Sequence, residues 1–248
     1  YKILKRMDSK PVTIRLLDPP LHEFLPNTKE QIQELAKEFN LTIKKVHNII
    51  DGLHELNPML GHRGCRLGIT FPEITAMQTQ AIMHATIQLY QEGLHPKPEI
   101  MIPLVGSLGE FINQKNIVVN EITKLVQDTN IKTNSIKIGT MIELPRACLI
   151  ANLIAKHADF LSFGTNDLTQ TTFGFSRDDI GSFLPEYLNQ KILDSDPFQH
   201  LDEQGVGELI ILAIQRARKV NKKIKIGICG EHGGDPQSIH FLATAGVD

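Results

Sequence analysis

Short apolar runs alternate along this chain with longer amphipathic segments, and this alternation restricts the possible fold more than any other feature. Five runs rich in Val, Ile, Leu and Phe have the character of strands buried on both faces of a parallel sheet, at residues 12–17, 100–105, 137–143, 160–164 and 224–229. Helical patterns occupy residues 72–92, 108–129, 144–156 and 205–221. Because repeated strand–helix–strand units require right-handed crossovers, the pattern predicts an α/β fold with a parallel sheet.

The order of these segments fits either a doubly wound sheet or a barrel. Residues 18–57 and 178–200 interrupt the alternation, and we interpret them as insertions carrying short helices at one end of the sheet. We expect six or seven strands, whereas a closed barrel needs eight. If the fold is a barrel, the sequence therefore represents an incomplete one.

The composition excludes several classes of protein. The formal net charge is −2, and the sequence pI is about 6.6, so nothing indicates a nucleic acid or a membrane surface as a partner. No apolar run approaches the length that a membrane span needs. Three widely separated cysteines do not form a disulfide framework and favour a reducing, cytoplasmic location.

Two acidic residues stand where predicted strands end. Glu143 closes the run KIGTMIE, and Asp167 follows the run FLSFGTN one strand–helix unit later. In a barrel both would lie at the carboxyl-terminal mouth, where active sites collect. Each could instead cap a helix start. Taken together they predict a Mg²⁺ site, because this ion is commonly held by one or two carboxylates together with substrate and water.

The residues around these two acids extend the candidate site. Gly164 and Thr165 would let backbone N–H groups approach an anionic ligand, and Asn166 adds a neutral donor. Cys229 ends another strand and faces a loop of glycines, an acid and a histidine, which is typical of a thiol that exchanges protons. An incidental cysteine in a tight glycine turn is the alternative.

Arginines supply local positive charge. Arg15 lies within a predicted strand, Arg63 and Arg66 lie in a glycine-rich loop at residues 61–68, and Arg177 follows the Asp167 segment. The planar guanidinium binds carboxylate and phosphate oxygens in a bidentate manner. Each arginine could be an ordinary ion-pair residue, but together at one rim they would form a cage for an anion.

Five motifs now identify a family. TIRLLDPPLHEFLP begins at Thr13, GHRGCRL at Gly61, GTMIELPR at Gly139, FGTNDLTQ at Phe163 and GICGEHGGDP at Gly227. Together they resemble the pyruvate, phosphate dikinase family over essentially the whole chain, in its C-terminal phosphoenolpyruvate/pyruvate domain. Phosphoenolpyruvate synthase and enzyme I of the sugar phosphotransferase system share the more general motifs, whereas the first and last motifs favour the dikinase.

This resemblance implies one domain over residues 1–248, a TIM-type (β/α)8 barrel with helical insertions that is incomplete at both ends. Glu143 and Asp167 would bind Mg²⁺, and the substrate would contact both of them. The other substrate-binding residues implied are Arg15, Arg63, Arg177, Gly164, Thr165 and Asn166. Cys229 would donate a proton to the enolate carbon when pyruvate forms.

The resemblance also implies partners outside the sequence. The phosphoryl carrier of the family is a histidine on a separate domain, and another domain binds the nucleotide. We find neither here, so this chain alone is not expected to catalyse the full reaction, ATP + pyruvate + phosphate = AMP + phosphoenolpyruvate + diphosphate. The full-length enzyme is expected to be a homodimer. The alternatives are phosphoenolpyruvate synthase, a Mg²⁺-dependent pyruvate or enolate lyase, and a fragment that only binds ligand or is inactive.

Overall fold

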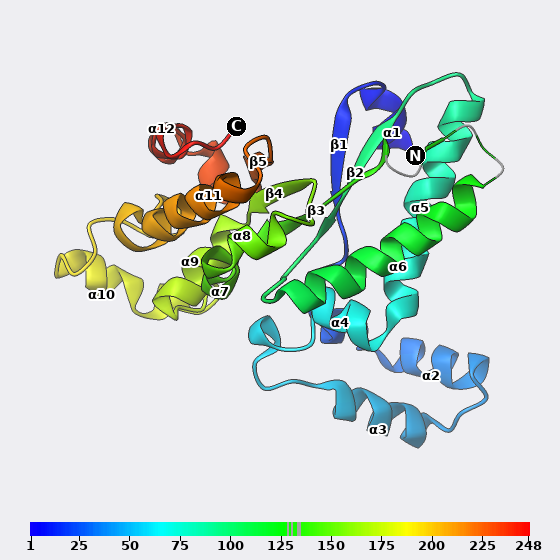
Figure 1. Ribbon diagram of the computed structural model, residues 1–248. Coiled ribbons are helices and arrows are strands. Elements are labelled where there is room, and N and C mark those ends of the chain that lie inside the picture. The colour runs from blue at the N-terminus through cyan, green and yellow to red at the C-terminus, as the bar shows by residue number, and fades with distance from the viewer. Residues whose placement is uncertain (128, 130, 133–134) are drawn as a thin grey trace.

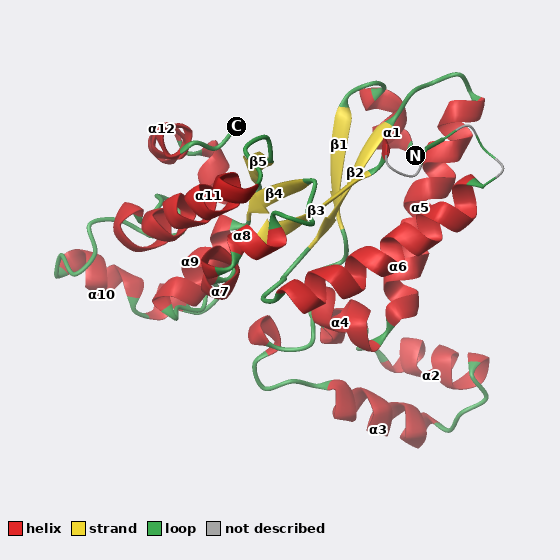
Figure 2. Ribbon diagram, in the orientation of Figure 1, coloured by secondary structure: helices red, strands yellow, loops and turns green. Residues whose placement is uncertain are grey.

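Five parallel strands form one sheet in the computed structural model, which describes residues 1–127, 129, 131–132 and 135–248. The strands are β1 Pro11–Arg15, β2 Lys97–Ile102, β3 Lys137–Ile142, β4 Phe160–Phe163 and β5 Lys225–Ile228. Consecutive strands are neighbours in the sheet, which twists and curls as half of a barrel does (Figure 2). This confirms the α/β fold and its likeness to an incomplete TIM-type barrel.

The expectation of six or seven strands was wrong for the described part of the chain, which contains five. The C-terminal residues illustrate the reason. Asp248 donates its N–H to the carbonyl of Ile226 on β5 at 2.8 Å and accepts from the N–H of Ile226 through its side chain at 2.8 Å. The chain therefore meets the edge of β5 there without forming a strand ladder.

Helices occupy the connections between the strands and cover the sheet (Figure 1). They are α1 Lys2–Met7, α2 Lys29–Glu38, α3 Ile43–Leu53, α4 Gly64–Thr70, α5 Pro72–Gln91, α6 Leu108–Val126, α7 Pro145–Leu149, α8 Ala151–Ile154, α9 Thr165–Phe173, α10 Leu184–Asn189, α11 Glu208–Val220 and α12 Pro236–Ala245. Within the described residues, no helix combines the length and apolar character that a membrane crossing requires.

Local sequence explains where the long helices begin and divide. Ser107 caps α6 and forms a capping box with Glu110, which satisfies backbone donors at the helix start. The single helix expected at residues 144–156 is wrong, because the backbone leaves the helical region at Ile150 (φ −112°, ψ 17°) and separates α7 from α8. The helix expected from residue 205 begins with a π-helical turn, Glu203–Gly207, and continues as α11.

The main core lies between the sheet and its covering helices. Alternate residues of β2, Ile100 and Ile102, are fully buried in it with Phe111 of α6 and Ile210 of α11. Met101 lies between them in sequence and belongs to a separate cluster on the opposite face of the sheet. Both faces of the central strands β2, β3 and β4 are therefore buried, as their continuous apolar runs predicted. In β1 the residues alternate between exposed and half-buried, so the prediction was wrong for that strand.

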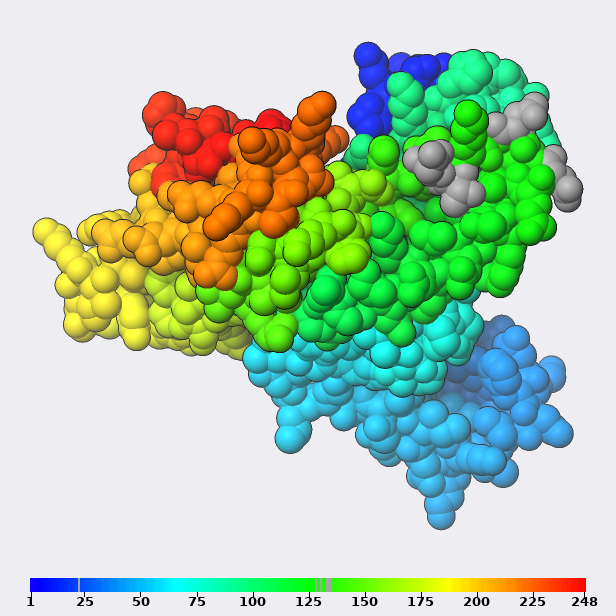
Figure 3. All heavy atoms as spheres, in the orientation of Figure 1, coloured from blue at the N-terminus to red at the C-terminus, as the bar shows by residue number. Residues whose placement is uncertain are grey.

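Both insertions contain the short helices expected from the sequence. Helices α2 and α3 form a hairpin that projects from the sheet (Figures 1 and 3) and has a small core of Ile32, Ala36 and Val46. Helix α10 lies in the second insertion, where Ile180, Leu184 and Phe198 form another cluster. Because all five strands run parallel, their carboxyl ends lie at one rim, and the candidate site residues follow those ends.

Candidate active site

Glu143 occupies the centre of this rim, directly after β3. Its side chain is completely buried, and Oε1 accepts a hydrogen bond of 2.5 Å from the backbone N–H of Leu104. Oε2 is buried without a hydrogen-bond partner. Burial raises the pKa of this carboxyl to about 8, and the charges of Asp167 and Asp18 add to the effect. A group that supplies positive charge to Oε2 would therefore be strongly favoured.

Leu104 owes its role to an unusual backbone conformation. It follows β2 and has φ 58°, in the left-handed region that non-glycine residues seldom adopt. This conformation accompanies the N–H contact to Glu143, while the Leu104 carbonyl lies 3.2 Å from Sγ of Cys65. Backbone strain of this kind costs on the order of 1–3 kcal/mol and is found most often at functional sites.

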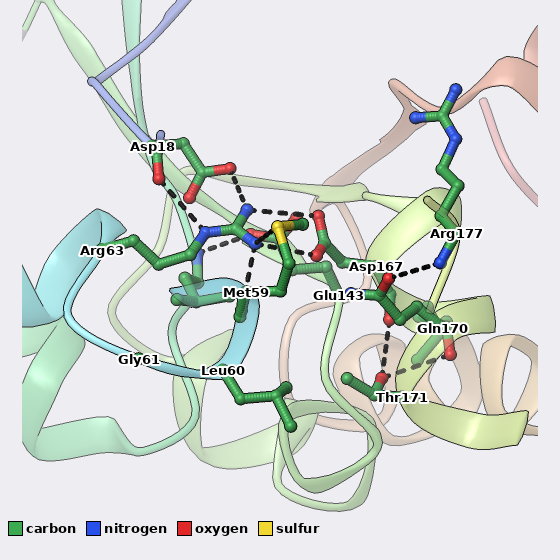
Figure 4. Close-up of polar contacts among 12 residues, drawn as sticks. Asp18, Met59, Leu60, Gly61, Arg63, Glu143, Asp167, Gln170, Thr171 and Arg177 are labelled. Carbon is green, nitrogen blue, oxygen red and sulfur yellow. Dashed lines mark hydrogen bonds and ion pairs between the residues drawn. The ribbon is translucent and has the colours of Figure 1, made fainter. Parts of the chain in front are cut away.

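Arg63 joins two carboxylates on either side of it (Figure 4). One terminal nitrogen lies 2.5 Å from Oδ2 of Asp18, and the other lies 3.2 Å from Oδ1 of Asp167. The Arg63 Nε donates to the Asp18 carbonyl at 3.1 Å, and a terminal nitrogen donates to the Met59 carbonyl at 3.2 Å. The guanidinium is buried, and its hydrogen-bonding groups are directed to protein oxygens.

The loop before α4 brings Arg63 into this position. The glycine-rich segment was expected to be a loop, but from Gly64 it forms α4. Gly64 has φ 56°, and a Cβ there would lie 2.8 Å from Cβ of Leu104 and 2.9 Å from Oδ1 of Asp18. Arg66 donates to the carbonyls of residues 60 and 61, at 2.7 and 2.9 Å, so it stabilises the turn and does not join the site.

Two carboxylates, those of Asp18 and Asp167, thus pair with the Arg63 guanidinium, and the charges of all three groups act on the nearby Glu143 carboxyl. The Oε2 atom of Glu143 and Oδ1 of Asp18 are both buried without hydrogen-bond partners. The described residues contain no group of three or more His, Cys, Asp or Glu side chains arranged as a metal centre. Glu143 and Asp167 nevertheless suit Mg²⁺ by their donor chemistry, because this ion takes few protein oxygens and keeps others from substrate and water.

Gly164 joins β4 to α9, and Thr165 and Asn166 are the first two residues of that helix. A Cβ on Gly164 would lie 2.5 Å from Oε2 of Glu143, so glycine lets the backbone pass against this oxygen. Thr165 is buried, and Asn166 Oδ1 accepts the N–H of Glu231 at 3.2 Å. The first backbone N–H groups of α9 have no partner within the helix and favour an anion.

Cys229 follows β5 and continues its pairing with β4. Its N–H donates to the carbonyl of Phe163 at 3.0 Å, and its Sγ lies 3.5 Å from the same oxygen. The residue is exposed overall, yet nearby protein atoms desolvate the sulfur. This desolvation raises the thiol pKa; Glu143 raises it further, whereas Ser162 and Arg15 oppose the rise. The thiol is therefore protonated at neutral pH.

The other two cysteines differ in environment. None of the three forms a disulfide, in line with the expectation from the sequence. Cys65 and Cys148 are both buried, and burial raises the pKa of each thiol to about 12. Only Cys229 combines exposure with a position at the rim.

The outer arginines reach the rim from two sides. Arg15 ends β1, is partly exposed and lies 3.1 Å from Oδ2 of Asp18. Arg177 forms an ion pair with Glu231 and points away from the Arg63 cluster (Figure 4). Since the N–H of Glu231 also bonds to Asn166, Glu231 connects Arg177 to the first turn of α9. The structure therefore places Arg15 and Arg63 together around Asp18, with Arg177 apart from them.

A cavity of about 640 Å³ opens beside these residues. One wall is the segment 56–60, whose Met59 carbonyl accepts from Arg63. The other wall is the end of α9 with the residues that follow it; the lining residues are Leu56, Asn57, Pro58, Met59, Leu60, Gln170, Thr171, Gly174, Phe175, Ser176, Asp178 and Asp179.

Asp18 and Leu104 were assigned no role from the sequence, and His232 was noted only as the histidine of the loop that Cys229 faces. Asp18 carries the same signal that identified Glu143, an acid shortly after a strand, three residues beyond Arg15. Nothing in the sequence marks Leu104, because its contribution is a backbone N–H. His232 is fully buried and contacts Thr165, which its position in a glycine-rich loop did not indicate.

Comparison with known proteins shows which family this chain resembles. The family model described as PEP-utilising enzyme, PEP-binding domain, matches residues 1–248. The chain is 54% identical over 248 residues to pyruvate, phosphate dikinase 1, chloroplastic, of Arabidopsis thaliana, covering 99% of this chain and 26% of the relative.

Bacterial relatives are equally similar. The pyruvate, phosphate dikinase of Clostridium symbiosum is 52% identical over 245 residues, which are 98% of this chain and 28% of the relative. That of Rickettsia prowazekii is 52% identical over 250 residues, covering 100% of this chain and 28% of the relative. The chain thus spans about a quarter of the length of the curated relatives it matches.

Proposed function

This chain belongs to the PEP-utilising enzyme family, as its PEP-binding domain, and on this premise we propose that it interconverts phosphoenolpyruvate and pyruvate. The phosphoryl group would pass to or from a phosphohistidine on another domain of the complete protein. The overall reaction would be ATP + pyruvate + phosphate = AMP + phosphoenolpyruvate + diphosphate. The names of the relatives support this choice.

The observation that carries the proposal is the unpaired Oε2 of Glu143, which is buried at the rim where Asp167 and Cys229 also lie. A carboxyl oxygen without a partner in a buried, acidic environment requires a cation or a proton. Mg²⁺ held by Glu143 and Asp167 would supply a Lewis acid for the oxygens of phosphoenolpyruvate or enolpyruvate. The unpaired Oε2 would thus bind a metal ion that takes further oxygen ligands from the substrate.

The residues of the chain would share the remaining steps. Arg15 would bind the carboxylate or phosphate of the substrate, and Arg63, whose donors are directed to protein oxygens, would stabilise these anionic groups through its positive charge. Arg177 would approach the substrate from the α9 side. The backbone of Gly164 and Thr165, with the Asn166 amide, would line the bound anion. These positions are supported by their proximity to Glu143 and Glu231.

Cys229 would complete the conversion to pyruvate. Its thiol gives its proton to the methylene carbon of the enolate, so a C–H bond forms and a thiolate remains. In the opposite direction the thiolate removes a proton from the methyl group of pyruvate. Because desolvation raises the thiol pKa, the protonated form is available at neutral pH, and the thiolate, once formed, is a strong base.

We also propose how partners would meet the site. The cavity of about 640 Å³ would admit the phosphohistidine of the other domain, since Arg63 contacts its wall through Met59. The complete protein would act as a homodimer. Because the net charge of −2 offers no overall attraction for anions, the anionic substrate would be held by local arginines, and neither a nucleic acid nor a membrane surface is proposed as a partner.

Two other reactions would use a similar rim. Phosphoenolpyruvate synthase would release orthophosphate and would not consume it, so phosphate-dependent formation of diphosphate by the complete protein separates the two. A carbon–carbon lyase would need no phosphohistidine. Retro-aldol cleavage by this chain alone would support the lyase.

Calorimetry with oxalate, which mimics the enolate of pyruvate, tests the central proposal. Oxalate should bind in the presence of Mg²⁺ and not in its absence, and Glu143→Gln should abolish binding. Glu73→Gln, an exposed residue at the start of α5, is the matched control and should bind as the unmodified chain does. Binding of oxalate without Mg²⁺, or unchanged binding by Glu143→Gln, would contradict the proposed metal site.

A further inference from the structure

His232 lies in a short 3-10 turn, Glu231–Gly234, three residues after Cys229. Its ring is completely buried. Nδ1 lies 2.8 Å from the hydroxyl oxygen of Thr165, and Nε2 lies 3.0 Å from the carbonyl oxygen of Pro197. One side chain therefore joins three segments: the loop after β5, the start of α9 and the second insertion.

These contacts assign the protons of His232. A carbonyl oxygen only accepts, so Nε2 must carry the hydrogen that binds Pro197. Burial lowers the pKa of the ring, which favours the neutral form. Nδ1 is then an acceptor, and the hydroxyl of Thr165 donates to it. Thr165 consequently has no hydroxyl hydrogen left for a ligand, and it can offer an anion only its backbone N–H.

A series of bonds joins the Cys229 loop to the segment that runs from the end of β4 into the start of α9. The N–H of Cys229 bonds to the carbonyl of Phe163 (3.0 Å), the N–H of Glu231 bonds to Asn166 Oδ1 (3.2 Å), and the Thr165 hydroxyl bonds to His232 (2.8 Å). Two of these three bonds use a backbone N–H. The contact with His232 is the one formed between two side chains.

Gly230 shows how closely the two segments approach. A Cβ on this residue would lie 1.8 Å from Oγ1 of Thr165 and 2.9 Å from its backbone nitrogen. The Thr165 hydroxyl thus lies between the Gly230 backbone and the His232 ring. Its hydrogen bond to the ring sets how far the thiol-bearing loop stands from the helix that carries Asp167.

The second insertion supports the ring from the other side. Besides the Pro197 carbonyl, Nδ1 of His200 lies 3.3 Å from Oδ2 of Asp235, and the N–H of Leu201 bonds to the Ser238 hydroxyl at 3.0 Å. These contacts connect residues 197–201 to residues 232–238. The segment that supplies the Pro197 carbonyl is therefore also held by contacts that do not involve His232.

We propose that His232 is a positioning residue for proton transfer by Cys229, and that it acts through Thr165. It holds the thiol at a constant place relative to the first turn of α9, where the enolate would be bound. The inference rests on the proposed function. His232 itself does not contact the substrate.

Two amide substitutions separate the bonds of the ring. Asparagine places its amide near the position of Nδ1, so His232→Asn keeps an acceptor for Thr165 and loses the bond to Pro197. Glutamine places its amide near Nε2, so His232→Gln keeps the bond to Pro197 and loses the acceptor for Thr165. If His232 acts through Thr165, the glutamine variant is impaired and the asparagine variant is not.

Pyruvate formation from phosphoenolpyruvate, AMP and diphosphate by the complete protein, coupled to lactate dehydrogenase, measures the effect. For His232→Gln, kcat should fall about 10- to 100-fold, the loss expected when a reacting group is displaced by about 1 Å. KM and the Kd of oxalate with Mg²⁺ should change less than about threefold, as should kcat for His232→Asn. Thr165→Val should reproduce the glutamine variant, and combining the two should add nothing further.

Equal losses of kcat in both amide variants, or a Kd for oxalate that rises as kcat falls, would overturn the inference. Alkylation of Cys229 by iodoacetamide supplies a measurement that does not depend on catalysis, with Cys229→Ser identifying the modified thiol. Release of the loop in His232→Gln should change the alkylation rate, whereas His232→Asn should keep the unmodified rate. Failure of the unmodified protein to bind oxalate or form pyruvate would refute the proposed function, and an alkylation rate unchanged in His232→Gln would separately refute the role of His232.

Discussion

The binding of Mg²⁺ should depend on pH through Glu143. With a carboxyl pKa of about 8, roughly nine-tenths of the metal-free sites hold a proton on Glu143 at pH 7. Mg²⁺ requires the carboxylate, so the ion must displace this proton. The Kd for Mg²⁺ at saturating oxalate should therefore rise about tenfold for each pH unit below about 7 and level off above about 9.

Calorimetry from pH 6 to pH 9 measures this dependence. In buffers with different heats of ionisation, the same titration at pH 7 should release nearly one proton for each ion bound. Glu73→Gln should retain the dependence, because Glu73 is an exposed residue in the first turn of α5. A Kd that stays constant between pH 6 and pH 8, with no proton released, would refute the argument that Glu143 is protonated in the metal-free site.

The same group influences the stability of the metal-free protein. Its pKa is raised in the folded state, so between about 4.5 and 8 the folded chain holds a proton that the unfolded chain releases. The contribution of Glu143 to the free energy of unfolding should thus decrease as pH rises through this range and stay constant above it. Urea unfolding of Glu143→Gln, measured against the unmodified chain, should lack this decrease.

Three further changes test individual contacts. Gly164→Ala should weaken Mg²⁺–oxalate binding at least tenfold and lower the free energy of unfolding by about 1–3 kcal/mol, because the added Cβ would lie 2.5 Å from the Glu143 carboxylate. Gly52→Ala is the calorimetric control, since a Cβ at Gly52 would have nothing within 4 Å. Cys229→Ala should abolish pyruvate formation yet leave the Kd of oxalate within about threefold, and equal loss of both would make the cysteine structural. Arg63→Met should cost about 3–5 kcal/mol in urea unfolding, since it leaves two aspartates without their buried partner, and a cost below about 1 kcal/mol would contradict that pairing.

Much of the rim could be predicted because it depends on strand ends. In a parallel sheet, residues that follow the strands necessarily meet at one edge, so Glu143, Asp167 and Cys229 could be brought together from the sequence alone. The two helices of the first insertion followed from local sequence patterns, and in the structure Thr28 and Thr42 cap them. Such features are determined by residues close to one another in the sequence.

The pairings within the rim could not be predicted in the same way. Arg63 was expected to bind a ligand, but which carboxylates it contacts depends on how the start of α4 packs against the residues that follow β2. The contribution of Leu104 is a backbone N–H in a left-handed conformation, and its side chain gives no sign of it. Arg177 pairs with Glu231, 54 residues later, which spacing alone does not reveal.

The hairpin of α2 and α3 has a consequence for the motions of the molecule. Its small core of Ile32, Ala36 and Val46 is separate from the main core, so its amides should exchange with solvent through local opening, well before those of the strands. The chain passes from α3 directly into segment 56–60, whose Met59 carbonyl binds Arg63. Local opening of the hairpin would thus disturb the hydrogen bond between the Met59 carbonyl and Arg63. Amide exchange rates in α2 and α3 would therefore report on a change in the contacts of Arg63 that occurs before the sheet itself opens.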